Sequence, residues 1–278
     1  MTAHTPTELP YRKVEFGYPE DLDPAWNRRR PEYAFAANGI SLIMPFAEPY
    51  FVKSVRSALP QLEGDLRVQT EGYLRQEIAH HVQHRRFNDL LVAQMPAVGR
   101  VERWMRRTYG WLSRRRSQKF NLAFAASSET IAFSIARWIE KNLDALFDDA
   151  DPVPTSLFLW HLAEEVEHKA AAYDVFEELD GSRLRYAWTA VVSLTILAWL
   201  VWAATVAQLV SSRRWANPLV YWRLLVKAVS LSFELLPTLA VSALPGHHPD
   251  SLVDPTYLPT WLATFDPATG RLSPPTSR

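Results

Sequence analysis

The 278-residue chain contains no cysteine. This absence excludes disulfide bridges, thiolate zinc sites and cysteine nucleophiles, and it is typical of a reducing compartment. Any metal ion must therefore be held by His, Asp and Glu side chains, which suit iron, manganese or zinc. The sequence also has no apolar run before Tyr33, so its first residues do not form a secretory signal peptide, and we expect a cytoplasmic protein.

Net charge and the common catalytic motifs are missing as well. The 30 basic and 30 acidic residues cancel, which argues against nucleic acid as a partner. The sequence has no G-x-S-x-G motif, no Walker loop and no Rossmann fingerprint. No nucleophile elbow or nucleotide-binding loop therefore competes with a metal site as the seat of function.

Glycine is scarce, with 9 residues, and prolines lie near the ends and between periodic segments. This pattern is typical of long helices with short connections, and no alternating strand pattern persists. Pro45 and Pro49 complicate the start of the first helix. We predict four bundle helices at 40–59, 65–94, 117–147 and 155–179, with a shorter helix at 101–112 between the second and the third.

The sequence predicts four regions along the chain. An extended N-terminal segment covers 1–39 and a metal-binding helical bundle covers 40–182. A hydrophobic helical hairpin or extension follows at 183–244, and an irregular tail at 245–278.

Residues 189–210 carry no charge, and as a helix they are long enough to cross a hydrocarbon core of about 30 Å. A second apolar stretch, 219–244, places Arg223, Lys227 and Glu234 on one helical face, which indicates an amphipathic rather than a spanning helix. Two alternatives stay open for the first stretch. It anchors the protein to the inner face of a membrane, or it is buried against the bundle or against a second subunit in a homodimer.

A first cluster of metal-ligand types lies in the second predicted helix. Glu77, His80 and His84 follow one another at offsets of 3 and 7, which puts them on one helical face. Glu77 and His80 stand one turn apart, so their carboxylate and imidazole can reach a single ion.

A second cluster lies in the fourth predicted helix, where His161, Glu165 and His168 follow at offsets of 4 and 7. One Glu-x-x-His pair alone is usually a solvated surface pair. Two such pairs, on the second and fourth helices and among apolar neighbours, favour a metal site.

Ferritin-like carboxylate bundles place Glu-x-x-His on two helices and one Glu on each of the other two. Here the single glutamates would be Glu48 and Glu129, with Glu140 on the face of Glu129 as its competitor. We therefore predict an all-α, ferritin-like four-helix bundle with a C-terminal hydrophobic helical extension. The predicted metal ligands are Glu48, Glu77, His80, Glu129, Glu165 and His168, with His84 and His161 either as further ligands or behind them.

Glu164, Asp174 and Asn88 are candidates to orient ligating imidazoles through the free ring nitrogen. We predict Glu164 and Asp174 as catalytic residues. The alternative for each is a surface or capping role.

The two clusters resemble the hallmarks of the bacterial family of predicted metal-dependent hydrolases. The family pattern Q-E-x-x-H-x-x-x-H starts here at Gln76, and W-H-x-x-E-E-x-E-H-K starts at Trp160. The late His-Pro of the family is similar to His248-Pro249, whereas its Gly-Glu is replaced by Ala47-Glu48. The resemblance implies metal dependence more directly than it implies hydrolysis.

Two ions held in this way allow two reactions. Carboxylate-rich, thiol-free ligation suits iron, with manganese or zinc as alternatives, and favours O₂-dependent oxidation of an apolar small molecule. A hydrolase using metal-activated hydroxide is the alternative. The contrasting class is a non-catalytic, membrane-associated metal-binding protein.

Overall fold

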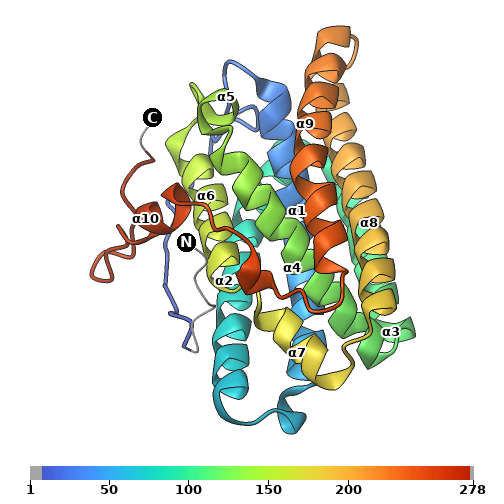
Figure 1. The fold of residues 1–278 in the computed structure, drawn as a ribbon. Helices are drawn as coiled ribbons and strands as arrows, with labels where there is room; N and C mark the ends of the chain where they lie inside the picture. The colour runs from blue at the N-terminus through green and yellow to red at the C-terminus, as the bar shows by residue number, and fades with distance from the viewer. Residues whose placement is uncertain (1–7, 276–278) are drawn as a thin grey trace.

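The structure, a computed structural model, describes residues 8–275 and confirms the all-α fold (Figure 1). Within this range there is no strand, and the β-bridges are two isolated pairs. The elements are α1 (Pro31–Arg56), η1 (Leu59–Gln61), α2 (Gly64–Gln94), α3 (Val98–Arg115), α4 (Gln118–Glu140), α5 (Leu143–Phe147), α6 (Pro152–Glu167), α7 (Ala171–Leu179), α8 (Arg183–Ser211), α9 (Pro218–Ser242), η2 (Pro249–Ser251) and α10 (Tyr257–Leu262).

The first helix differs most from its predicted bounds. It begins at Pro31 rather than near residue 40, and it continues through Pro45 and Pro49. Proline is tolerated in the first turn because the N–H it lacks has no helical partner there. The internal prolines do break the ladder locally, since each removes the helical N–H that would bond the carbonyl four residues earlier. The predicted start near residue 40 was therefore wrong.

The third and fourth predicted helices are each divided in two. The third becomes α4 and α5, and the fourth becomes α6 and α7. α6 starts with an Asp151 side chain that caps Val153 N at 2.9 Å. It ends at His168, whose φ of −108° and ψ of 17° leave the helical region. His168 thus follows the helix end instead of standing inside a continuous helix.

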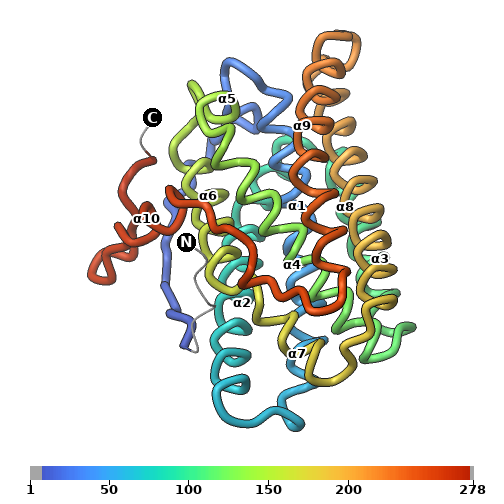
Figure 2. Tube along the Cα trace, viewed as in Figure 1, coloured from blue at the N-terminus to red at the C-terminus, as the bar shows by residue number. Residues whose placement is uncertain are grey.

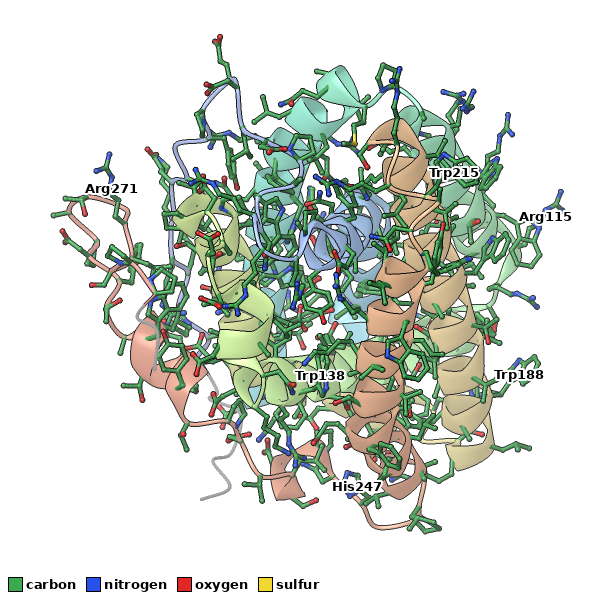
Figure 3. The ribbon with its side chains drawn as sticks, turned by 90° about the horizontal axis from the view of Figure 1, so that it is seen from above. Arg115, Trp138, Trp188, Trp215, His247 and Arg271 are labelled. Carbon is green, nitrogen blue, oxygen red and sulfur yellow. The ribbon has the colours of Figure 1, made fainter. Side chains whose placement is uncertain are left out.

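Four helices, α1, α2, α4 and α6, form the bundle that contains the core, and α1 lies in the middle when the molecule is seen from above (Figure 3). The remaining long helices, α3, α8 and α9, cover one side of α1 and α4. Buried apolar side chains from all four bundle helices belong to one core cluster. The four elements predicted to carry ligands are therefore neighbours.

The N-terminal segment from residue 8 to residue 30 has no helix and runs beside α6 and α10 (Figure 2). Glu15 N donates to Gly270 O at 2.9 Å, and Arg12 forms an ion pair with Glu167 at 2.7 Å. The predicted extended segment therefore ends at Pro31, where α1 begins.

α8 and α9 stand side by side along one edge of the molecule (Figure 1). Both are long and apolar enough to cross a membrane by length and composition. The predicted charged face of α9 points toward the bundle. Arg223 binds Glu32 at 3.0 Å, and Glu234 binds Arg137 at 3.0 Å.

Candidate metal centre

The bundle interior brings together the eight side chains predicted as metal ligands. α1 supplies one, α2 three, α4 one and α6 with its C-terminal cap three, and each is at most 6% exposed. They are Glu48, Glu77, His80, His84, Glu129, His161, Glu165 and His168.

One group of four has donor atoms within 4.8 Å of one another, namely Glu77, His80, Glu165 and His168. The ring of His168 lies between two carboxylates. Its Nε2 is 3.5 Å from Glu77 Oε1 and its Nδ1 is 3.3 Å from Glu129 Oε2. Neither ring nitrogen has a hydrogen-bond partner. This environment suits a ligand to a cation shared with the carboxylates.

His80 is oriented by Glu164. The imidazole Nε2 lies 2.9 Å from Glu164 Oε2, whereas Nδ1 has no hydrogen-bond partner and lies 3.5 Å from Glu77 Oε1. A carboxylate that accepts from one ring nitrogen leaves the other free to bind a metal, which is the usual support of ligating histidines. Glu164 therefore lies where its predicted orienting role requires.

The outer side of Glu164 is held by the N-terminal segment. Arg12 Nη1 contacts Glu164 Oε1 at 3.1 Å, and both guanidinium nitrogens bind Glu167 at 2.7 Å. Burial opposes protonation of His80, but the hydrogen bond to Glu164 and the negative charge of Glu164 and Glu77 nearby outweigh burial and raise the His80 pKa to about 10. Without a metal, His80 is therefore a cation among carboxylates.

The second group contains Glu48, His84 and His161, again with donor atoms within 4.8 Å of one another. Hydrogen bonds define the His84 tautomer. Asn88 Nδ2 donates to Ser41 O at 2.8 Å, so Asn88 Oδ1 accepts the Ser41 hydroxyl at 2.7 Å. Ser41 Oγ has then used its only hydrogen, and it must accept the Nδ1–H of His84 at 2.8 Å.

The hydrogen bonds also define the tautomer of His161. Burial lowers the pKa of both His84 and His161 well below the usual range, so both are neutral. His84 Nε2 therefore accepts from His161 Nδ1 at 2.7 Å. His161 Nε2 is left as a lone pair, 2.7 Å from Glu165 Oε1 and 3.5 Å from Glu48 Oε1. A lone pair that close to a carboxylate oxygen requires a proton or a metal ion between them.

Burial also changes the pKa of carboxylates in the cluster. Burial and repulsion from Glu77 raise the pKa of Glu48 well above its usual value, and burial and repulsion from Glu129 do the same to Glu165. Both oxygens of Glu48 and both of Glu77 are buried without a hydrogen-bond partner. Buried polar atoms are seldom left in this way. The unpaired donors converge, which is the expected state of a metal site considered without its ions.

A cavity of about 110 Å³ adjoins the carboxylates. Glu48, Glu77, Glu129, Glu165 and His161 form its polar end, and Ser128, Ser193 and Tyr109 add the other polar groups. The rest of its wall is apolar and comes from α1, α4, α5, α6 and α8. A small apolar molecule would fit between this wall and the ligand cluster.

Two residues that the sequence analysis considered for the site, Asp174 and Glu140, lie outside the ligand cluster. Asp174 Oδ1 is 2.7 Å from His248 Nε2, so this residue contacts a C-terminal histidine and not an imidazole of the cluster. Glu140, the competitor of Glu129, accepts the backbone N–H groups of Tyr257 and Leu258 at the start of α10. Glu129 instead accepts from Tyr73 at 2.8 Å beside the cluster.

Sequence reasoning missed the residues that support the cluster from a distance. Arg12 lies 152 positions from Glu164 along the chain, and Ser41 lies 43 positions from His84. Neither belongs to a motif with a recognisable spacing. The only signal near Ser41 is Pro45, whose missing N–H leaves the Ser41 carbonyl to Asn88.

Comparison with protein families gives one match over most of the chain. The model of a family described as predicted metal-dependent hydrolase matches residues 10–252, which includes all eight clustered side chains. Comparisons with curated proteins and with solved structures give no match.

Proposed function

Since the chain belongs to the family of predicted metal-dependent hydrolases, we propose that its buried cluster holds two metal ions and acts on a small apolar substrate. The donor set supports two ions. Four glutamates and up to four histidines exceed what one ion of usual coordination number needs. The Glu and Glu-x-x-His distribution over four helices matches that of dinuclear carboxylate bundles.

The unpaired donor atoms indicate how the ions would be shared. Glu77, His80 through Nδ1, Glu165 and His168 would hold one ion. Glu48 and His161 through Nε2 would hold the other, with His84 behind His161 fixing its tautomer. Glu129 lies next to His168 and completes the carboxylate set.

Iron is the proposed metal, and oxidation with dioxygen the proposed reaction. Iron in such a site supplies the redox change that dioxygen chemistry needs. The observation that carries this proposal is the apolar cavity at the carboxylates. Its mostly apolar wall suits dioxygen and an apolar substrate, and apart from the proposed ligands it offers only Ser128, Ser193 and Tyr109 as polar groups to recognise an ester or amide.

Several residues around the proposed metal site orient the ligands and would not themselves bind a metal. Glu164 holds the ring of His80, and Ser41 with His84 holds the ring of His161. Tyr73 donates to Glu129 and so limits the carboxylate positions available to it. These bonds keep the ligands oriented without consuming the atoms that would face a metal.

Hydrolysis is the second candidate, and the family description favours it. Zinc or manganese in the same ligands would lower the pKa of bound water. Every ring nitrogen of His84 and His161 is engaged in this arrangement, by Ser41, by the other ring or by the ion, so a carboxylate of the cluster would take the proton instead of this pair.

Metal analysis and oxygen uptake distinguish the candidates. Protein purified from cells without added metal is analysed for iron, zinc and manganese per chain. The reduced protein is then mixed with oxygenated buffer in an oxygen electrode, alone and with medium-chain alcohols, fatty acids and their esters. Two irons and oxygen uptake that increases with a substrate support oxidation. Zinc or manganese with oxygen-independent ester cleavage supports hydrolysis. Absence of stoichiometric metal would overturn both.

A further inference from the structure

One side of the molecule exposes an unusual set of aromatic side chains. Eleven tryptophans are present in the sequence, and the seven that are exposed among residues 8–275 all lie on α3, on α8, on α9 or in the turn between the last two. Trp188 points away from the body (Figure 3), and Trp188 and Trp215 are both more than half exposed. Tryptophan prefers the boundary between water and hydrocarbon, because its ring is apolar and its N–H is polar.

The helices α8 and α9 turn several polar side chains inward and leave many apolar ones exposed. On α8, Gln208 bonds Asn38 at 2.8 Å and Ser193 bonds Ser128 at 2.7 Å. On α9, Phe233 is 78% exposed, whereas Glu234 beside it faces Arg137. Only 28% of the most apolar window of α8 and 17% of that of α9 is buried. Neither helix is therefore a core helix of the bundle.

Charge is segregated to the same side. The residues of α3 with Arg116 and those of α8, α9 and their turn carry thirteen Arg or Lys against Glu102 and Glu234, although the whole chain has no net charge. Nine of these cations are exposed, all of them on α3, at Arg116 or in the turn between α8 and α9, whereas the four on α8 and α9 are half-buried in polar contacts. Both glutamates are paired inward, Glu102 with Arg85 and Glu234 with Arg137. The arginines of α3 are exposed, and they alternate with Trp104 and Trp111 along one stripe of that helix.

We propose that this surface, the exposed residues of α3, α8 and α9 (the α3–α8–α9 face), binds a lipid bilayer with anionic headgroups. Apolar side chains flanked by arginine and tryptophan are the composition of helices that lie in a membrane interface. The arginines favour anionic phosphates, and the exposed leucine, valine and phenylalanine side chains favour the acyl chains below them.

The helices lie along the bilayer surface and do not cross it. Trp104 and Arg107 of α3 share a surface groove with Ile196, Trp199 and Leu200, near the middle of α8. If α8 spanned the membrane, Arg107 would be held near the bilayer centre, where a charged side chain is strongly disfavoured. At headgroup depth the same arginine can meet a phosphate.

The α3–α8–α9 face also adjoins the proposed substrate cavity, and this step rests on the proposed function. Ser193 and Leu197 of α8 form part of the cavity wall. A substrate dissolved in the bilayer would thus meet the helix that separates lipid from the ligand cluster. Lipid binding itself is measured without turnover, so its outcome is independent of the reaction.

Flotation with vesicles tests the proposal on the full chain. The protein is mixed with phosphatidylcholine vesicles that either contain or lack phosphatidylglycerol, at low and high salt. We expect at least tenfold tighter binding to the anionic vesicles, weakened by salt. Equal binding to neutral vesicles, or none to either, would overturn the proposal.

Matched variants locate the binding surface. Arg103→Glu with Arg107→Glu is expected to weaken binding at least tenfold, whereas the equal charge change Arg75→Glu with Arg271→Glu leaves it within twofold. Phe233→Ser is expected to weaken binding, and Val253→Ser, also exposed, is its control. An equal loss in the control pair would contradict the assigned face. A stable dimer that Phe233→Ser dissociates, together with no vesicle binding, would assign the face to a second copy of the chain.

Lipids brominated at different depths test the orientation. The exposed tryptophans should be quenched more strongly by bromine near the headgroup than by bromine near the chain ends. The opposite order would show that α8 spans the bilayer. Wild-type protein suffices for this measurement, so it does not depend on the folding of any variant.

Discussion

The Asn88 side chain supplies the N–H donor that Pro45 lacks. Pro45 has no N–H to donate to the carbonyl of Ser41, and Asn88 Nδ2 donates to that carbonyl at 2.8 Å. The bond also orients the amide so that its oxygen accepts the Ser41 hydroxyl at 2.7 Å. A series of hydrogen bonds thus starts where Pro45 interrupts the helix, and it runs from Asn88 through Ser41 and His84 to His161.

Asn88→Ala should destabilise the metal-free protein by about 2–4 kcal/mol, because two buried Ser41 groups lose their partner. In a Pro45→Ala background the loss should be about 1 kcal/mol smaller, since the backbone N–H of the substituted alanine restores the helical bond to Ser41 O. Urea denaturation of the four proteins measures the coupling. Equal losses in the two backgrounds would show that Pro45 and Asn88 act independently.

Glu164→Gln should lower metal affinity about 10- to 100-fold, because the amide can present its N–H₂ to His80 and no longer fixes the ring tautomer. Glu167→Gln is the matched control. Glu167 also binds Arg12 but makes no bond to His80. Competition with a chromogenic chelator gives both affinities, and similar losses in the two variants would locate the effect in Arg12 rather than His80.

The ligand cluster could be predicted because helical periodicity determines which side chains share a face. Offsets of 3, 4 and 7 grouped the Glu and His residues of α2 and of α6 before any tertiary contact was known. Periodicity does not determine the level of one helix relative to its neighbours. Glu129 and Glu140 share a face of α4, and only packing brings Glu129 to the cluster and Glu140 to α10.

The support of the cluster could not be predicted for a related reason. Arg12 reaches Glu164 because a segment without secondary structure runs beside α6, and no local pattern encodes that path. His168 ends α6 without a glycine or proline to mark the break. Asp174 has ligand-like spacing, yet its partner His248 comes from the C-terminal region.

Glu129→Gln should lower metal affinity at least tenfold, because Glu129 lies among the unpaired donors next to His168. Glu140→Gln serves as control on the same helix and the same face, and it should retain the full metal content. Elemental analysis after dialysis against a weak chelator measures both. Loss of metal from Glu140→Gln alone would show that the metal binds near Glu140 and not near Glu129.

Metal affinity should rise with pH. Glu48 and Glu165 have raised pKa values, chiefly through burial, whereas the neighbouring Glu164 and Glu77 outweigh burial and raise the pKa of His80 to about 10. Each proton that a metal displaces adds about tenfold in apparent affinity per pH unit, up to the pKa of its group. Titration calorimetry in buffers of different ionisation enthalpy should show proton release. Uptake without proton release would mean that these groups are already ionised without metal.

The metal-free protein should show the opposite trend in stability. A group whose pKa is raised by folding contributes stability at low pH and loses it as pH rises through the folded value, so His80 loses its contribution between about 6.5 and about 10. Glu48 and Glu165 change in the same direction above their usual pKa. His84 and His161, whose pKa is lowered by burial, destabilise the fold below 6.5. Between about pH 4.5 and 6.5 the two glutamates and the two histidines act in opposite directions and cancel, so the thermal midpoint without metal should change little there and fall as pH rises above 6.5. With metal bound, the alkaline fall should disappear, because the ions replace the protons of His80 and the carboxylates. A metal-free midpoint that stays constant from pH 6.5 to 10 would show that no proton is held at His80.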